Sequence, residues 1–260
     1  MFPLRDRTPP ERRPLVNWLL VLACVAVQLH LSFGLLDDPE AAQRFVDRFG
    51  LVPAHVRTGF MHPELLGEVP DLWLRDVALR FFTSPFVHGG LTHLLSNVWF
   101  LLVFGDNVEG RLGRLRYLLF WFACAAVAAA LHVVMIPPEV SVATASGFVV
   151  ASRNPLLDVP MVGASGAIAG VLGAYLAWFP RSRVATFVPP LFVVELPALL
   201  FLGIWFVLQF VAARSTALVG SLGTGVAYWA HVGGFGAGLA IALLLLLARR
   251  GRKTSPAGAP

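Results

Sequence analysis

The stretch Gly163-Ala164-Ser165-Gly166 opens an apolar run over residues 167–179, and together they predict a membrane helix with a serine at its mouth. The flanking glycines permit a tight entry into the helix and the close approach of another backbone. The helix N-terminus would place free N–H groups and a partial positive charge beside Ser165. This pattern suits a nucleophile, and an ordinary N-cap with small-residue packing would also explain it.

The composition around this stretch predicts a polytopic membrane protein. Of the 260 residues 57% are hydrophobic and 13% are charged, which is rare for a soluble domain. Apolar runs predict an all-α bundle of six transmembrane helices, at residues 15–36, 91–104, 115–136, 165–179, 191–213 and 227–248. The two cysteines lie in apolar runs, where they suit packing and form neither a disulfide framework nor a metal pattern.

The six runs define one domain, residues 15–248, which we expect to lie between a disordered cytoplasmic N-terminus (residues 1–14) and a basic cytoplasmic tail (residues 249–260). The first run is too long for a cleaved signal peptide and is expected to remain a span. The outer loop 37–88 should contain helical pieces in the membrane interface. Residues 137–160 should form an irregular loop, and Pro197 should kink the fifth span near its start.

The distribution of Lys and Arg predicts the orientation. With both termini inside, thirteen of the twenty basic residues fall in inner segments, which is the usual bias. The net charge of +5 thus comes from clusters at span ends, and no nucleic-acid groove is expected. From Ser165 to Arg181 the helix would cover roughly 24 Å, less than the hydrocarbon core of about 30 Å. We therefore expect a water-filled cavity that opens outward and is sunk into the outer leaflet.

Two other span mouths would bring polar groups to the same end of the bundle. His231 lies near the start of the last span, and a histidine in a span is a functional candidate by default. The fourth and the last span each carry glycines on one face. These are Gly166 and Gly170 on the fourth span and Gly234 and Gly238 on the last. Such faces would let His231 reach Ser165, although a glycine-packed helix pair with a histidine bonded to a carbonyl explains them too.

His93 and Asn97 are i and i+4 on the second span, so both could donate hydrogen bonds to one oxyanion. His88 is expected to support the loop geometry. No carboxylate or thiolate stands at ligand spacing from these histidines, so we expect neither metal nor cofactor. No acid lies where it would orient His231, which favours a Ser-His dyad over a triad. The sequence places Glu195 for local bonding and Glu109 for pairing with nearby arginines.

Three motifs, in order, resemble the rhomboid family of intramembrane serine proteases over residues 80–239: His-Gly-Gly-Leu-Thr-His-Leu-Leu-Ser-Asn at 88–97, Gly-Ala-Ser-Gly at 163–166, and Ala-His-Val-Gly-Gly-Phe-Gly-Ala-Gly at 230–238. The resemblance implies that Ser165 is the nucleophile and His231 the general base. It implies that His93, Asn97 and the Ser165 N–H bind the oxyanion, and that Gly163, Gly166, Gly234 and Gly238 support them. Arg80 resembles the arginine of a Trp-Arg pair in the first loop of the family, but Leu79 stands where that pair has its tryptophan. Ala169 stands where some members have a tyrosine that stacks on the catalytic histidine.

The resemblance also implies a function. A rhomboid-like protease would cleave transmembrane segments of membrane proteins near the outer leaflet, in a bacterial inner membrane, with the fifth span gating substrate entry. Its partners would be those substrates and the lipid bilayer. A rhomboid-like protein that binds transmembrane helices without cleaving them is the alternative, and the presence of both Ser165 and His231 favours the protease. A transporter would predict paired charges at the midplane, and the sequence shows none.

Overall fold

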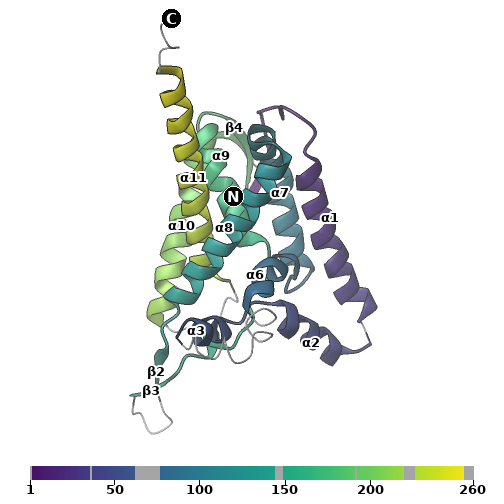
Figure 1. The fold of residues 1–260 in the computed structure, drawn as a ribbon, viewed down its shortest axis with the longest axis vertical. Coiled ribbons are helices and arrows are strands. Elements are labelled where there is room, and N and C mark those ends of the chain that lie inside the picture. Colours follow the sequence, from purple (N-terminus) through teal and green to yellow (C-terminus); the bar gives the residue numbers. More distant parts are fainter. Residues whose placement is uncertain are drawn as a thin grey trace, which may run out of the picture.

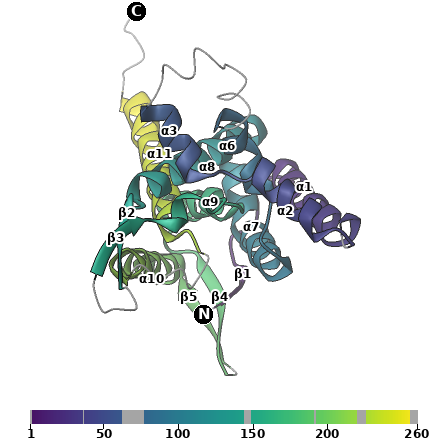
Figure 2. The same cartoon turned by 90° about the horizontal axis from the view of Figure 1, so that it is seen from below.

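The chain folds into a helical bundle in a computed structural model that describes residues 2–35, 37–61, 77–143, 149–190, 192–219 and 226–254. The long helices are α1 (Leu15–Leu29, continued by a π-helical turn over His30–Gly34), α7 (Leu91–Leu112), α8 (Arg114–Met135), α9 (Ser165–Trp178), α10 (Ala198–Val219) and α11 (Tyr228–Thr254). Figure 2 shows α9 at the centre, with α7, α8, α10 and α11 around it. Its apolar residues are accordingly buried through most of its length.

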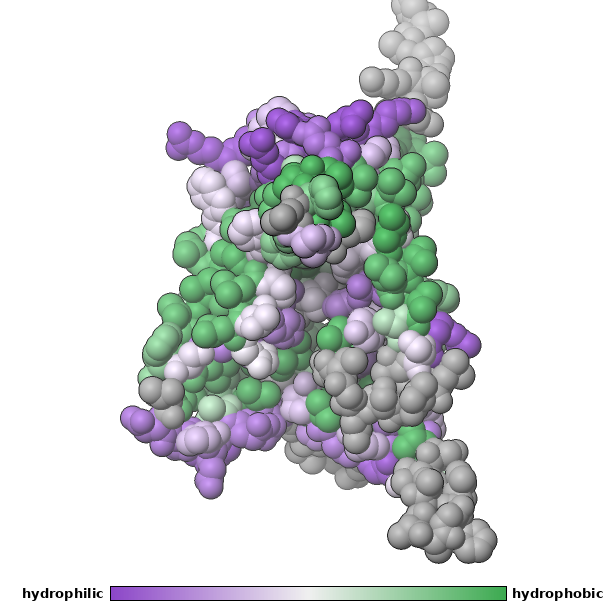
Figure 3. All heavy atoms as spheres, turned by 180° about the vertical axis from the view of Figure 1, so that it is seen from behind, coloured by the Kyte–Doolittle hydropathy of each residue, from purple (hydrophilic) through white to green (hydrophobic). Residues whose placement is uncertain are grey.

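The lengths and composition of the helices confirm a polytopic membrane protein. Within the described residues, four helices could cross a membrane: Leu15–Gly34, Arg114–Met135, Ala198–Ser215 and Tyr228–Arg249. A fifth candidate is the pair Leu79–Phe86 and Leu91–Leu112, which is bent by 96°, and α9 is a shorter apolar helix. On the face drawn in Figure 3, hydrophobic residues form a belt and the most hydrophilic residues gather at its two ends. The count of six spans stays a prediction.

Two small antiparallel sheets, which the all-α prediction did not include, lie at the ends of the helices. β1 (Phe2–Asp6) pairs with β4 (Arg183–Val188), and β4 pairs with β5 (Phe192–Pro197). β2 (Glu139–Ala143) pairs with β3 (Val149–Arg153) where an irregular loop was predicted. Figure 1 shows β2 and β3 at one end of the bundle, which we call the hairpin end. We call the opposite end, where α9 leads into β4, the sheet end.

The three-stranded sheet corrects three predictions. The N-terminus is not disordered over Phe2–Asp6, because β1 is anchored there by a hydrogen bond of 2.8 Å from Asn107 Nδ2 to Asp6. Glu195 does not bond locally: its partner is Arg7, whose guanidinium holds the pKa of that carboxyl below its ordinary value. Pro197 ends β5 and does not kink a helix, because α10 begins only at Ala198. The fifth helix therefore starts seven residues later than predicted.

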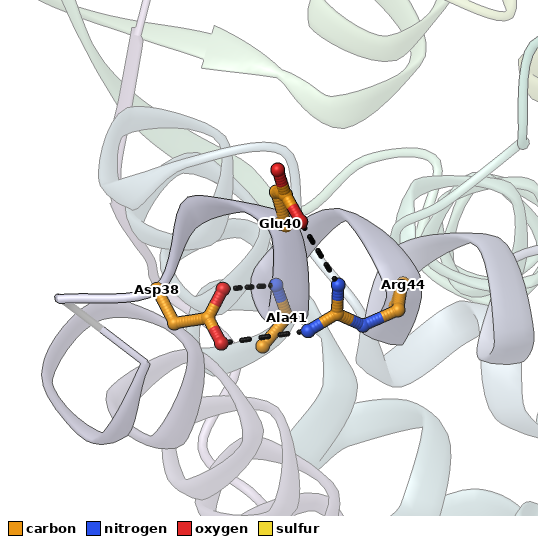
Figure 4. Close-up of polar contacts among 4 residues, drawn as sticks. All are labelled: Asp38, Glu40, Ala41 and Arg44. Atoms are coloured by element: carbon orange, nitrogen blue, oxygen red, sulfur yellow. Dashed lines mark hydrogen bonds and ion pairs between the residues drawn. The ribbon is translucent and has the colours of Figure 1, made fainter.

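Helical pieces in the loop 37–88 are confirmed where the structure describes it, and residues 62–76 lie outside that part. The helical pieces in the described part are α2 (Pro39–Phe49), α3 (Pro53–Met61), α6 (Leu79–Thr83) and a 3-10 turn (Ser84–Phe86). Figure 1 shows α2 and α3 at the hairpin end. In Figure 4, the Asp38 carboxylate caps α2 by accepting from Ala41 N–H at 2.7 Å, and Arg44 pairs with Asp38 and Glu40. The cap explains why α2 begins at this point.

α1 is capped by a side chain from another helix. Its own N-cap residue, Pro14, has no side-chain cap, and Glu109 of α7 accepts instead from Val16 N–H (3.1 Å) and Asn17 N–H (2.7 Å). Glu109 is fully buried, and a carboxylate at a helix N-terminus also favours the helix dipole. Its bonds thus go to α1 and not to the arginines near it in sequence, of which Arg111 pairs with Glu11.

Glu109→Ala should destabilise the fold, because it leaves a buried N–H group (Asn17) and a partly buried one (Val16) without a partner at the start of α1. We expect a loss of about 1–3 kcal/mol in the free energy of unfolding, measured as a lower Tm in detergent. Glu40→Ala is the matched control, since Glu40 is exposed on α2 and its ion pair contributes little. Equal Tm values for the two variants would refute the capping role.

Candidate active site

Three helices begin at the hairpin end, and each carries one of the predicted polar groups. Ser165 is the first residue of α9, His231 lies in the first turn of α11, and His93 lies in the first turn of α7. Figure 1 shows these three helices running from the hairpin end toward the sheet end. The predicted parallel arrangement of the three mouths is therefore present in the fold.

Ser165 and His231 form a hydrogen bond across α9 and α11. Ser165 Oγ lies 2.9 Å from His231 Nε2, within the distance at which a histidine can take the proton of a hydroxyl. On the other edge of the ring, His231 Nδ1 lies 2.7 Å from the amide oxygen of Gln209 on α10. An amide oxygen only accepts, so Nδ1 carries the proton and the lone pair of Nε2 faces the serine. This is the tautomer that a general base requires.

α10 supplies two contacts to His231 that sequence reasoning missed. Trp205 lies against the imidazole with ring centroids 5.9 Å apart, and Gln209 follows it at i+4 on the same helix face. Tyr228 approaches the ring edge-on at 6.2 Å. The aromatic neighbours of His231 thus come from α10 and α11, whereas Ala169 of α9 is a fully buried small residue. The sequence did contain a signal for this contact: Gln209 is a side-chain amide in an otherwise apolar span, and such a group needs a hydrogen-bond partner in lipid.

Close packing of α9 on α11 sets the distance between serine and histidine. A Cβ atom built on Gly234 would lie 1.9 Å from the Gly166 carbonyl oxygen, and one built on Gly238 would lie 1.9 Å from the Gly170 carbonyl oxygen. Gly166 and Gly170 are also closed from the other side by Ala128 and Cys124 of α8. Only glycine allows these backbones to approach so closely.

The loop before Ser165 is held by three separate elements. Leu51 and Met161 form an antiparallel bridge, and Gly163 N–H donates to the Ser84 carbonyl at 3.0 Å. Gly163 has φ of +111°, and a Cβ there would lie 2.6 Å from Cε1 of His93. Both the conformation and the space require glycine at this position. The His93 ring is consequently packed directly over the loop that delivers the serine.

His88 and Asn97 lie around His93. The His88 and His93 rings meet edge to face with centroids 5.1 Å apart, and buried His88 contacts the Phe86 carbonyl through Nδ1 at 3.2 Å. Asn97 donates one amide hydrogen to the His93 carbonyl at 3.0 Å, which leaves its second hydrogen for another acceptor. The structure therefore brings all the predicted polar residues together at the hairpin end.

One cavity of about 750 Å³, in the size range of ligand-binding sites, lies beside the serine and the histidine. Its walls include the predicted Ser165, His231, His93 and Asn97, and further residues from α8 and the 137–160 segment, such as His132, Met135 and Asn154. His132 of α8 thus lines the cavity. In the described part of the chain, no group of three or more His, Cys, Asp or Glu is placed to hold a metal ion.

Comparison with known families identifies the family of this chain. The family model of the Rhomboid domain matches residues 75–248, which includes α7 to α10 and most of α11. A search of curated proteins found no match. The matched region carries the serine, the histidine and the glycine-packed helix pair, and it covers more than half of the chain. The chain therefore belongs to the rhomboid family.

Proposed function

We propose that this protein is an intramembrane serine endopeptidase that cleaves transmembrane segments of other membrane proteins. The observation that carries the proposal is the 2.9 Å contact between Ser165 Oγ and His231 Nε2, at the mouth of a central helix within a membrane bundle. Membership of the rhomboid family supports it, because the motifs resemble those of its proteases. The basic residues predict that the sheet end faces the cytoplasm and the hairpin end faces outward.

In the proposed mechanism, Ser165 attacks the scissile carbonyl carbon while His231 Nε2 takes the hydroxyl proton. His231 then gives that proton to the leaving amine, which yields an acyl-enzyme. His231 then takes a proton from a water molecule of the cavity as that water attacks the ester carbonyl. His231 returns this proton to Ser165 Oγ as the ester bond breaks, which releases the second product and restores the serine. No metal or other cofactor takes part in these steps.

The negative oxygen of the intermediate would be bound between α9 and α7. The first N–H groups of α9 have no acceptor within the helix and point toward the site, which makes them ready donors. His93, packed over Gly163, and Asn97, which has one amide hydrogen to spare, line the same cavity from α7. Each such donor typically contributes about 3 kcal/mol to transition-state stabilisation.

The direct test uses purified protein in detergent with a single-span test substrate. We expect two products, with mass spectrometry placing the cut near the outer end of the substrate span. A small fluorophosphonate should also label the protein at Ser165. If the protein co-purifies with several such substrates and cuts none of them, the helix-binding alternative is correct and the proposal fails.

Chelation of divalent metals should leave the rate unchanged, because every step uses groups of the chain and water. The measurement is the cleavage rate with and without excess EDTA, with prior fluorophosphonate treatment as the positive control for inhibition. Loss of activity in EDTA that returns on adding a divalent metal would contradict the mechanism.

A further inference from the structure

We infer that Gln209 of α10 is the positioning residue for His231, and that it makes the catalytic base competent only while α10 is packed against α11. The inference rests on the proposed function, since it assigns a third partner to the Ser-His pair. Nothing in the Rhomboid match assigns a role to this residue. Its basis is the 2.7 Å contact from His231 Nδ1 to Gln209 Oε1.

Gln209 stands out chemically on α10. Between residues 198 and 213, the side chains that can form hydrogen bonds are Trp205 and Gln209. The preceding Leu208 is 60% exposed, whereas the Gln209 amide turns inward to His231. An amide without a partner in lipid is costly, so its place on the inner face favours a defined partner. That partner is the imidazole edge remote from the serine.

The bond determines the state of the imidazole. A neutral histidine has two tautomers, and only the one with its proton on Nδ1 offers Nε2 to Ser165. The Gln209 oxygen selects that tautomer, and the Trp205 ring limits rotation of the imidazole from the same helix. In serine hydrolases a carboxylate commonly serves this purpose. Here a neutral amide can do so without placing a second charge in the membrane.

α10 is also the candidate span least enclosed by the bundle. Of its most apolar window 22% is buried, against 28% to 39% for the other three candidate spans among the described residues. Its contact with α11 includes stacked rings of Phe206 and Phe235 with centroids 4.6 Å apart. Moving α10 outward would exchange these contacts for lipid and would separate Gln209 from His231. The position of the helix and the orientation of the base are therefore coupled.

The test separates positioning of the base from access of the substrate. Gln209→Met keeps the length and removes the acceptor, whereas Gln209→Glu keeps an acceptor oxygen at the same place. Leu208→Met is the matched control on the outward face of α10. Each variant is measured for cleavage (kcat and KM), for the rate of Ser165 labelling by a small fluorophosphonate, and for Tm in detergent.

We expect Gln209→Met to lower both kcat and the labelling rate roughly 10–100-fold, with KM little changed. This is less than the ~10⁴-fold loss seen when a charged orienting residue is replaced in a serine protease. Gln209→Glu should recover most of the labelling rate, and Leu208→Met should match the wild type. Nitrogen NMR of the histidines should show the Nδ1-protonated tautomer of His231 in the wild type and a mixture in Gln209→Met.

Several results would overturn the inference. One is a Gln209→Met protein that labels and cleaves like the wild type. Another is a change in substrate cleavage alone with normal labelling, which would make α10 a gate without a role in orienting the base. If Gln209→Met fails to fold, Gln209→Asn, which withdraws the amide by one methylene, must show the same loss of labelling. A wild type that neither labels nor cleaves refutes the proposed function instead, so the two failures are distinguishable.

Discussion

Ser165→Ala is expected to lower cleavage at least about 10⁴-fold, because it removes the atom that forms the acyl-enzyme. Any residual rate would come from binding and oxyanion donors alone. His231→Ala should cost a similar factor, and the double variant should be no slower than either single one, since the two residues act as a unit. Product formation by gel and fluorophosphonate labelling measure both effects.

Ser96→Ala is the matched control for this prediction. Ser96 lines the same cavity, but its hydroxyl donates to the His93 carbonyl of its own helix at 2.9 Å. We expect its activity within about twofold of the wild type, because exposed side-chain bonds of this kind contribute little. A Ser165→Ala protein as active as Ser96→Ala would show that the assignment of the nucleophile is wrong.

Gly234→Ala should be among the most damaging changes outside the reacting groups. Its Cβ would sit 1.9 Å from the Gly166 carbonyl oxygen, and backbone on a buried helix cannot move aside locally. α9 and α11 must separate by on the order of 1 Å, a shift that can reduce catalysis about 10²-fold. Overpacking should also destabilise the fold by about 1–3 kcal/mol. The measurements are kcat/KM and Tm in detergent.

Gly236→Ala provides the control on the same helix. A Cβ at Gly236 meets no atom within 4 Å, and alanine is the better helix former, so Tm should be unchanged or higher. The contrast removes helix propensity as an explanation, because both variants make the same chemical change two residues apart. Equal activity in the two proteins would refute the view that glycine packing sets the Ser165–His231 distance.

The sequence by itself determined where most helices begin and which polar residues stand at the starts of three of them. α7 begins at the predicted residue, α8 and α11 lie within one residue of their predicted starts, and α9 begins at Ser165. Apolar runs and glycine patterns are local features of the chain, so they can be recognised in the sequence without knowledge of the fold. The polar residues at three helix mouths were identified because a polar group in a span is costly and needs a reason.

The tertiary structure alone decided the interactions between distant segments. Pairing of β1 with β4 joins residues about 180 positions apart, the cap on α1 comes from Glu109 of α7, and the partner of His231 comes from α10. The sequence around a hydrogen-bonding group does not indicate which distant segment will supply its partner. That choice follows from the crossing of packed helices, which brought Gln209 to the imidazole and made a two-residue prediction into a three-residue arrangement.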